Sequence, residues 1–281
     1  MFFLLAAVFL AAGTSGLTVA VIGSIPVNLQ AEGQVSAQSA GTSLGYVAAD
    51  AVAYSTHVDA VLLAGGILRG SLRAGEITDE DIRRVFPEDH GIAVAWMTAE
   101  EIAAVLEIGA SHLVFDPATE SIDRDRSAYD GFPQITGLSI QYDVSAPPGE
   151  RLYSAEWDDG TALDAGDPLR RYAVAMTEES MNGAYGWPRV EAYETTGVTL
   201  RDALTEYIRD KGNEVEDPIK SFVLIKHGQR IETIGSNDSV ITARMPRGTI
   251  ALVVLLVMAV IGVYKSRNLR LAEEAGRRTL D

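Results

Sequence analysis

The amino-acid sequence predicts a mixed α/β domain followed by one membrane-spanning helix. Runs rich in β-branched residues alternate with segments whose apolar residues recur at helical spacing, a pattern typical of a sheet flanked by helices. Two capping signals mark helix starts within this alternation. Residues 249–264 are 16 consecutive residues without a charge, which predicts a helix that crosses a bilayer.

Composition limits the classes of function. The 281 residues include 23 Lys and Arg against 39 Asp and Glu, so the formal net charge is −16. A chain this acidic repels polyanions, which disfavours nucleic acid as a partner. The absence of cysteine excludes disulfides, thiolate nucleophiles and cysteine-ligated metals. The sequence implies no cofactor.

The first part of the domain is expected to run strand, helix, strand. Residues 17–22 and 60–63 are β-rich runs, and both are predicted to form strands. The apolar residues between them that recur at helical spacing are Leu44, Val47, Ala48 and Ala51. Three later helices are also expected. Thr78 is an N-cap followed by three acidic residues, Thr98 and Glu101 form a capping box, and residues 200–208 have an amphipathic pattern.

Alternation predicts two half-buried strands, at residues 138–142 and 172–176. Pro147 to Gly149 mark an exposed turn rather than a domain boundary, because strand patterns continue on both sides. The central region is therefore expected to form one domain.

Both ends carry targeting signals. Residues 1–16 are predicted to be a signal peptide, from 11 consecutive apolar residues followed by small ones. No Lys or Arg precedes Arg69, which leaves an uncleaved anchor or a misplaced start codon as alternatives. The tail, 265–281, has five basic and three acidic residues and is expected to be cytoplasmic. These signals predict a single-pass protein of the cell membrane, with an extracytoplasmic domain at 17–235 and a linker at 236–248.

Four segments in order carry a family resemblance. They are TSLGYVAADA (42–51), AGGILRGSLRAGEITDEDIRRVFP (64–87), GFPQITGLSIQYD (131–143) and NGAYGWPRV (182–190). Together they resemble the C-terminal domain of 5'-nucleotidases and UDP-sugar hydrolases, over about residues 19–218. The resemblance implies a mixed sheet with helices that holds a nucleoside.

In that family a separate N-terminal metallophosphatase domain binds two metals and breaks the phosphate bond. This chain has four histidines, and none lies in the Asp-x-His or Gly-Asn-His patterns that such a site requires. No catalytic residue and no metal site are therefore expected here. The histidines are His57, His90, His112 and His227.

The resemblance implies a ligand site that is only partly retained. Arg69 falls on the arginine of the Gly-Gly-Gly-Ile-Arg motif, where a guanidinium meets ribose hydroxyls or phosphate. Ala64 and Ile67 depart from that motif. The candidate ligand-binding residues are Gly65, Gly66, Arg69, Gly183, Tyr185 and Trp187. Tyr185 and Trp187 offer a substitute aromatic platform, or else pin the loop to the core.

Other family residues are replaced. The two phenylalanines that stack on the base correspond to Glu88 and Glu179, and an aspartate corresponds to Tyr185. Gln34 and Gln38 stand in place of two phosphate-binding arginines. Carboxylates cannot stack on a base, and they repel phosphate.

Two main functions follow from these replacements. One is a non-catalytic surface module that binds a small ligand, such as a nucleotide-like molecule or a sugar, or a protein partner. The other is the substrate-binding half of a nucleotide-hydrolysing enzyme whose metallophosphatase domain is a separate chain. A gene that lost its catalytic half is a further possibility.

Overall fold

The computed structural model describes residues 20–32, 36–164, 167–216, 222–227 and 229–234. The helices and short 3-10 turns are α1 (Ser43–Thr56), η1 (Gly65–Ile67), α2 (Asp79–Val85), α3 (Ala99–Ser111), α4 (Glu178–Met181), η2 (Ala184–Gly186), α5 (Leu200–Lys211) and η3 (Gly212–Glu214). The predicted signal peptide, linker, transmembrane segment and tail lie outside the described residues. Within those residues, no helix has the length and apolar character needed to cross a membrane.

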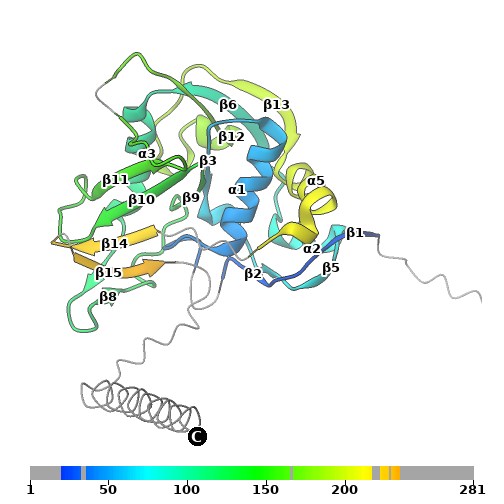
Figure 1. Ribbon diagram of the computed structural model, residues 1–281, viewed down its shortest axis with the longest axis horizontal. Helices are drawn as coiled ribbons and strands as arrows, with labels where there is room; N and C mark the ends of the chain where they lie inside the picture. Colours follow the sequence, from blue (N-terminus) through cyan, green and yellow to red (C-terminus); the bar gives the residue numbers. More distant parts are fainter. Residues whose placement is uncertain (1–19, 33–35, 165–166, 217–221, 228, 235–281) are drawn as a thin grey trace, which may run out of the picture. The chain divides into compact units, whose positions relative to one another are not determined.

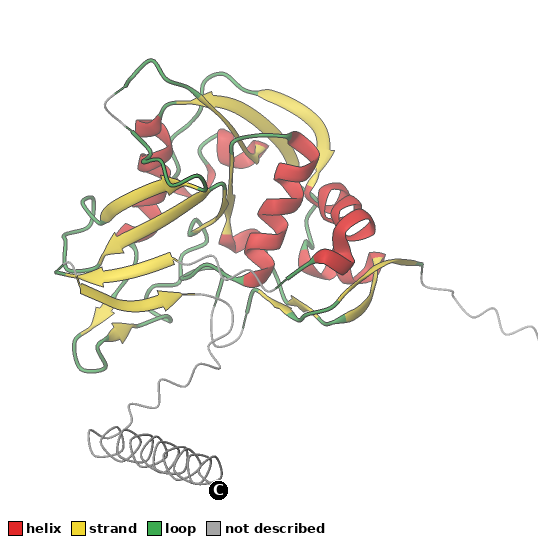
Figure 2. Ribbon diagram, in the orientation of Figure 1, coloured by secondary structure: helices red, strands yellow, loops and turns green. Residues whose placement is uncertain are grey.

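The strands form two main sheets and three short pairs (Figures 1 and 2). The five-stranded sheet has the order β13 (Glu194–Thr199), β6 (Gly91–Met97), β12 (Tyr172–Thr177), β3 (Ala60–Ala64) and β9 (Pro133–Thr136). The four-stranded sheet has the order β11 (Leu152–Trp157), β10 (Leu138–Asp143), β14 (Phe222–Lys226) and β15 (Gln229–Ile234). The short pairs are β1 (Val21–Ile25) with β5 (Gly75–Thr78), β2 (Leu29–Gln30) with β4 (Ser71–Leu72), and β7 (Phe115–Asp116) with β8 (Ser121–Ile122). Both main sheets are mixed, because β12 is parallel to β3 and β10 is parallel to β14.

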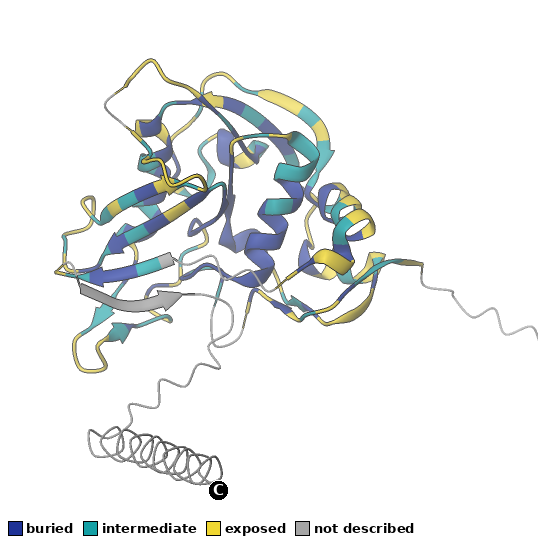
Figure 3. Cartoon of the chain, viewed as in Figure 1, coloured by how far each residue is buried: buried dark blue, intermediate teal, exposed yellow. Residues whose placement is uncertain are grey.

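Helix α1 is the most buried helix of the domain (Figure 3). It packs on β3 and β9 and against α5, and Thr42 caps its first turn by accepting a hydrogen bond from the Gly45 N–H. Helix α3 contacts β9 and β11, so it lies beside both main sheets. These contacts cover the five-stranded sheet with a continuous apolar core.

Local signals predicted the helices well. Thr78 with Asp81 and Thr98 with Glu101 both form reciprocal capping boxes, as the sequence pattern indicated for Thr98. The predicted amphipathic helix at 200–208 is α5, which begins after a third capping box between Thr199 and Asp202. Each capping box joins two residues that are three positions apart, so it forms from the local sequence and does not need a distant partner.

The expectations about strands are confirmed in part. Among the described residues the first strand is β1, at 21–25, and it pairs antiparallel with β5. It overlaps the end of the strand expected at 17–22, of which residues 17–19 lie outside the described residues. The expected order of strand, helix and strand is confirmed by β1, α1 and β3, with the short strand β2 before α1. The two strands β1 and β3 belong to different sheets. The strand at 172–177 is not half-buried, because Val174 to Thr177 are all buried. As the middle strand of five, β12 is covered on both faces.

Candidate functional site

The candidate residues gather at one edge of the five-stranded sheet. Arg69 follows β3 and η1, while Glu179 and Tyr185 follow β12. Because β3 and β12 are parallel, the segments after them emerge at the same edge. β6 is antiparallel to β12, so His90, just before β6, lies at this edge as well. The topology thus brings together residues that are far apart in the sequence.

Arg69 keeps most of its hydrogen-bonding capacity. Its backbone N–H donates to the Val85 carbonyl at 2.9 Å, and its Nη1 donates to the Leu68 carbonyl at 3.0 Å. The side chain is exposed, and no ion pair involves it among the described residues. The guanidinium therefore has donors that are free to meet a ligand.

Gly65 and Gly66 serve packing. Their N–H groups donate to the carbonyls of Phe132 at 2.8 Å and Asp130 at 2.7 Å. A Cβ on Gly65 would lie 1.8 Å from the Ala37 carbonyl oxygen, and a Cβ on Gly66 would lie 2.5 Å from the Asp130 side chain. Only glycine allows the chain to pass this closely. Both N–H groups are already used, so neither is available to a ligand in this conformation.

The loop after α4 has an unusual backbone. Gly183 has a φ of 88° and Tyr185 has a φ of 60°, a left-handed conformation that is costly for tyrosine. The Tyr129 hydroxyl donates a hydrogen bond to the Tyr185 carbonyl, which helps to hold this conformation. Tyr185 itself is partly buried, so part of its ring faces solvent.

Trp187 is a core residue. Its side chain is 3% exposed, and its Nε1 donates to the Gly131 carbonyl at 2.9 Å. The ring meets Tyr185 edge to face, with 6.4 Å between centroids. Burial leaves the indole no open face for a ligand, so Trp187 anchors the loop to the core. Tyr185 is the ring of this pair that reaches the surface.

Burial and charged groups of both signs act on the Tyr185 phenol. Burial raises the pKa of this phenol above its ordinary value, and the charges of Glu179, Asp130 and Glu88 raise it further. Arg69 acts in the opposite direction and lowers this pKa. The charge of Arg69 therefore acts on the Tyr185 phenol. The surroundings are acidic, however, with three negative groups against one guanidinium.

Two further contacts organise this acidic cluster. The Nδ1 atom of His90 lies 3.3 Å from Glu179 Oε1, and the His90 residue is 9% exposed. The side-chain amide of Gln38 donates to Asp130 Oδ1 at 2.5 Å. Gln38 is thus hydrogen-bonded to a carboxylate, at a position where the family resemblance implies a phosphate-binding arginine. Gln34 lies outside the described residues.

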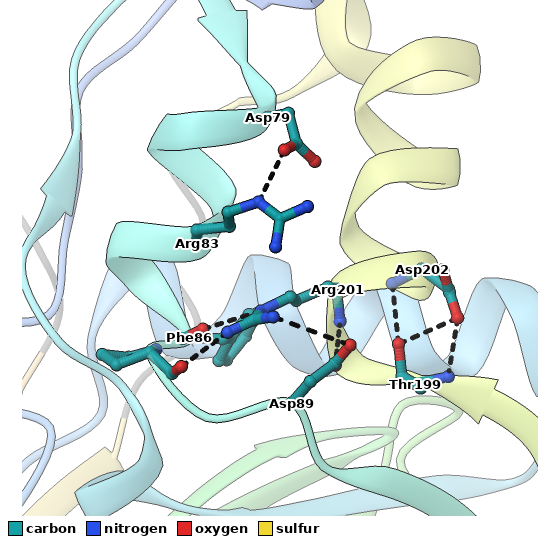
Figure 4. A network of polar contacts seen from close by, with 8 residues as sticks. Asp79, Arg83, Phe86, Asp89, Thr199, Arg201 and Asp202 are labelled. Carbon is teal, nitrogen blue, oxygen red and sulfur yellow. Dashed lines mark hydrogen bonds and ion pairs between the residues drawn. The ribbon is translucent and has the colours of Figure 1, made fainter.

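Arg201 fixes the segment that carries Glu88 (Figure 4). It stands at the start of α5, where its Nε and Nη2 atoms donate to the carbonyls of Phe86 at 2.9 Å and Pro87 at 2.6 Å. Its Nη1 lies 3.9 Å from Asp89 Oδ2. A single guanidinium therefore contacts the two residues before Glu88 and the residue after it, and so orients this segment of the site.

Sequence reasoning missed two residues of the site. Asp130 directly precedes the recognised segment at 131–143, so its position was a usable signal. Arg201 carried no signal, because its partners are backbone carbonyls more than 100 residues away. No group of three His, Asp or Glu side chains in the described part of the chain is arranged to hold a metal ion.

The electrostatics predict opposite shifts for two variants. Glu179→Gln removes a negative charge, so the Tyr185 pKa should fall toward its ordinary value, whereas Arg69→Ala should raise it further. Titration of ¹³C-labelled tyrosine by NMR measures both shifts. Glu206→Gln is the control, because Glu206 raises the pKa of Tyr54 and should leave Tyr185 unchanged. Shifts of the same sign in both variants would contradict this arrangement.

Comparison with known proteins gives consistent results. The family model for the 5'-nucleotidase C-terminal domain matches residues 21–192. By sequence, the chain is 27% identical over 171 residues to the Silent protein UshA(0) of Salmonella typhimurium, covering 60% of this chain and 27% of that protein. It is 22% identical over 163 residues to the trifunctional nucleotide phosphoesterase protein YfkN of Bacillus subtilis, covering 57% of this chain and 10% of that protein.

Solved structures show the same fold. The 5'-nucleotidase precursor from Thermus thermophilus matches with a TM-score of 0.62 and 24% identity, over 74% of this chain and 40% of that one. The NAD nucleotidase of Haemophilus influenzae matches with a TM-score of 0.56 and 15% identity, over 79% of this chain and 39% of that one. The chain thus spans less than half the length of these relatives. The family match, the shared fold and the order of the recognised segments together establish that this chain belongs to the 5'-nucleotidase C-terminal domain family.

Proposed function

We propose that this chain is a non-catalytic binding module with the fold of a nucleotidase substrate-recognition domain. The observation that carries the proposal is a set of three carboxylates at this edge of the sheet. Asp130 accepts a hydrogen bond from Gln38, Glu179 lies beside His90, and Glu88 belongs to the segment that Arg201 holds. Two of them occupy the positions where the family resemblance places base-stacking rings. Loss of two stacked rings removes about 2–6 kcal/mol of binding free energy. A nucleotide therefore binds weakly at this edge.

Arg69 supports a role in binding a different ligand. Its guanidinium is exposed and can grip a small carboxylate, a phosphate or vicinal hydroxyls without an aromatic floor. The three nearby carboxylates oppose a multiply charged anion. A small sugar or a single carboxylate suits this setting better than a nucleotide does.

A second function is that of the substrate-binding half of a nucleotide-hydrolysing enzyme. This chain covers 10% and 27% of two relatives by sequence. The exposed guanidinium of Arg69 supports this second function. A separate metallophosphatase chain that supplies the metals would complete a nucleotide-hydrolysing enzyme, with this chain orienting the substrate.

Activity and binding assays separate the two functions. The purified chain should not hydrolyse AMP, UDP-glucose or a generic phosphodiester, with or without Mn²⁺, Co²⁺ or Zn²⁺. AMP should bind weakly to the wild type, and the double variant Glu88→Phe/Glu179→Phe should bind it about 30-fold more tightly or better, because two rings are restored. Calorimetric titration measures both affinities.

The matched control replaces Glu80 and Glu100 with phenylalanine, since both are exposed on other helices. This control should not gain affinity for AMP. EDTA-sensitive turnover that survives repurification would overturn the non-catalytic function. Tight AMP binding by the wild type would favour the substrate-binding half of an enzyme.

We further propose that the domain is extracytoplasmic and held to the cell membrane by residues 249–264. The uncharged run and the basic residues after it support this orientation. Protease added to intact cells should remove the domain and leave a C-terminal epitope tag protected. Loss of the tag with an intact domain would reverse the orientation.

A further inference from the structure

A second cleft lies apart from the Arg69 site. Its volume is about 560 Å³, and it opens between β6, β13 and the segment 189–193 that leads into β13. This volume is in the range of about 300–1,000 Å³ that is usual for ligand pockets. Arg69, Glu88, Asp130, Glu179 and Tyr185 do not line it. The cleft lies along the second half of β6, whereas His90 precedes the start of that strand.

The wall of the cleft contains an unusually exposed aromatic ring. Trp96 is 68% exposed, whereas Trp187 is 3% exposed. Val94 and Trp96 are two positions apart in β6, so their side chains share one face of the sheet. Glu194 pairs with Val94 across the strands and points to the same face. The indole therefore forms a flat apolar surface with a carboxylate beside it.

Polar groups of defined direction surround this surface. The Asn182 Nδ2 atom donates to the Glu178 carbonyl and to the Tyr193 hydroxyl, both at 2.8 Å. These bonds use both amide hydrogens of Asn182 and fix the Tyr193 ring. The Asn182 Oδ1 atom remains an acceptor, and the Tyr193 hydroxyl hydrogen remains a donor. Both residues line the cleft, which therefore presents an acceptor and a donor near the indole.

The charges of the lining select the class of ligand. Glu191 and Glu194 line the cleft together with Arg189, so the local net charge is negative and disfavours phosphate or sulfate. Arg189 opposes an organic cation, which the indole face would otherwise attract. A neutral ring with hydroxyl groups satisfies all of these constraints. Its C–H face can pack on the indole while its hydroxyls meet the carboxylates, the guanidinium and Asn182.

We propose that this cleft binds a neutral saccharide stacked on Trp96. The site is independent of Arg69, so it can hold a ligand whatever binds at the other edge of the sheet. Saccharide rings offer both an apolar face and a polar rim, which is the combination that Trp96 and the surrounding side chains present. A glycan at a surface could thus recruit the domain through this cleft.

A glycan array followed by calorimetry tests the proposal. The full-length chain should bind one or more neutral oligosaccharides on an array that also carries sialylated and sulfated glycans. Trp96→Ala should weaken the best binder about tenfold or more. Tyr153→Ala is the control, because Tyr153 is also an exposed aromatic residue, at 63%, but it lies on β11 outside the cleft. That variant should bind as the wild type does.

Thermal melts establish that Trp96→Ala and the more conservative Trp96→Phe remain folded, as expected for an exposed position. Several results would overturn the proposal. These are an array with no bound glycan, binding of anionic glycans alone, and saccharide binding that Trp96→Ala leaves unchanged. Trp96-dependent binding of tetramethylammonium chloride in place of any saccharide would also overturn it and identify a cation site.

Discussion

The buried side chain of Gln134 connects the sheet to the loop on which the candidate site depends. From β9, its Oε1 accepts hydrogen bonds from the Thr42 N–H at 2.9 Å and the Thr42 hydroxyl at 3.1 Å. Its Nε2 donates to the carbonyls of Ala37 at 2.9 Å and Ala40 at 2.7 Å. One amide thereby satisfies several buried polar groups, whose burial without partners would be costly. It also positions Thr42, the cap of α1.

The loop that Gln134 holds contacts the residues of the Arg69 site directly. The loop at 36–42 is held against Gly65, where only a glycine fits beside the Ala37 carbonyl. From the same loop, Gln38 donates to Asp130, and its carbonyl accepts from the Tyr129 N–H. Asp130 then contributes to the charge around Tyr185. The buried amide of Gln134 thus holds the loop from which Gln38 contacts Asp130, one of the acidic residues of the site.

The sequence predicted features that depend on near neighbours. The N-cap at Thr78, the capping box at Thr98 and the buried face of α5 were predicted correctly, because their partners are within one or two helical turns. The pairing of β1 with β5 and the double burial of β12 were not predicted, since both depend on strand order across the sheet. Arg69 and Tyr185 were identified through a resemblance. Arg201 was missed, because a guanidinium that binds distant carbonyls leaves no local pattern.

Two surfaces of one small domain therefore present different chemistry. The Arg69 edge combines an exposed guanidinium with carboxylates that act on Tyr185, while the Trp96 cleft has an exposed indole ring and a rim of mixed charge. Gly65 and Gly66 are required for close packing of the backbone rather than for contact with a ligand. A domain of this kind can lose a family ligand without losing the fold, because the packing and the ligand contacts depend on different atoms.

The role of Gln134 is measured most directly by denaturant unfolding of Gln134→Ala beside Gln141→Ala. Gln141 is also a strand glutamine, but it is only partly buried on β10, and no side-chain hydrogen bond involves it among the described residues. We predict that Gln134→Ala lowers the free energy of unfolding by about 2–4 kcal/mol, because several buried groups lose their partner. Gln141→Ala should change it by less than about 0.5 kcal/mol. Equal, small effects of the two substitutions would contradict the dependence of the loop and the site on Gln134.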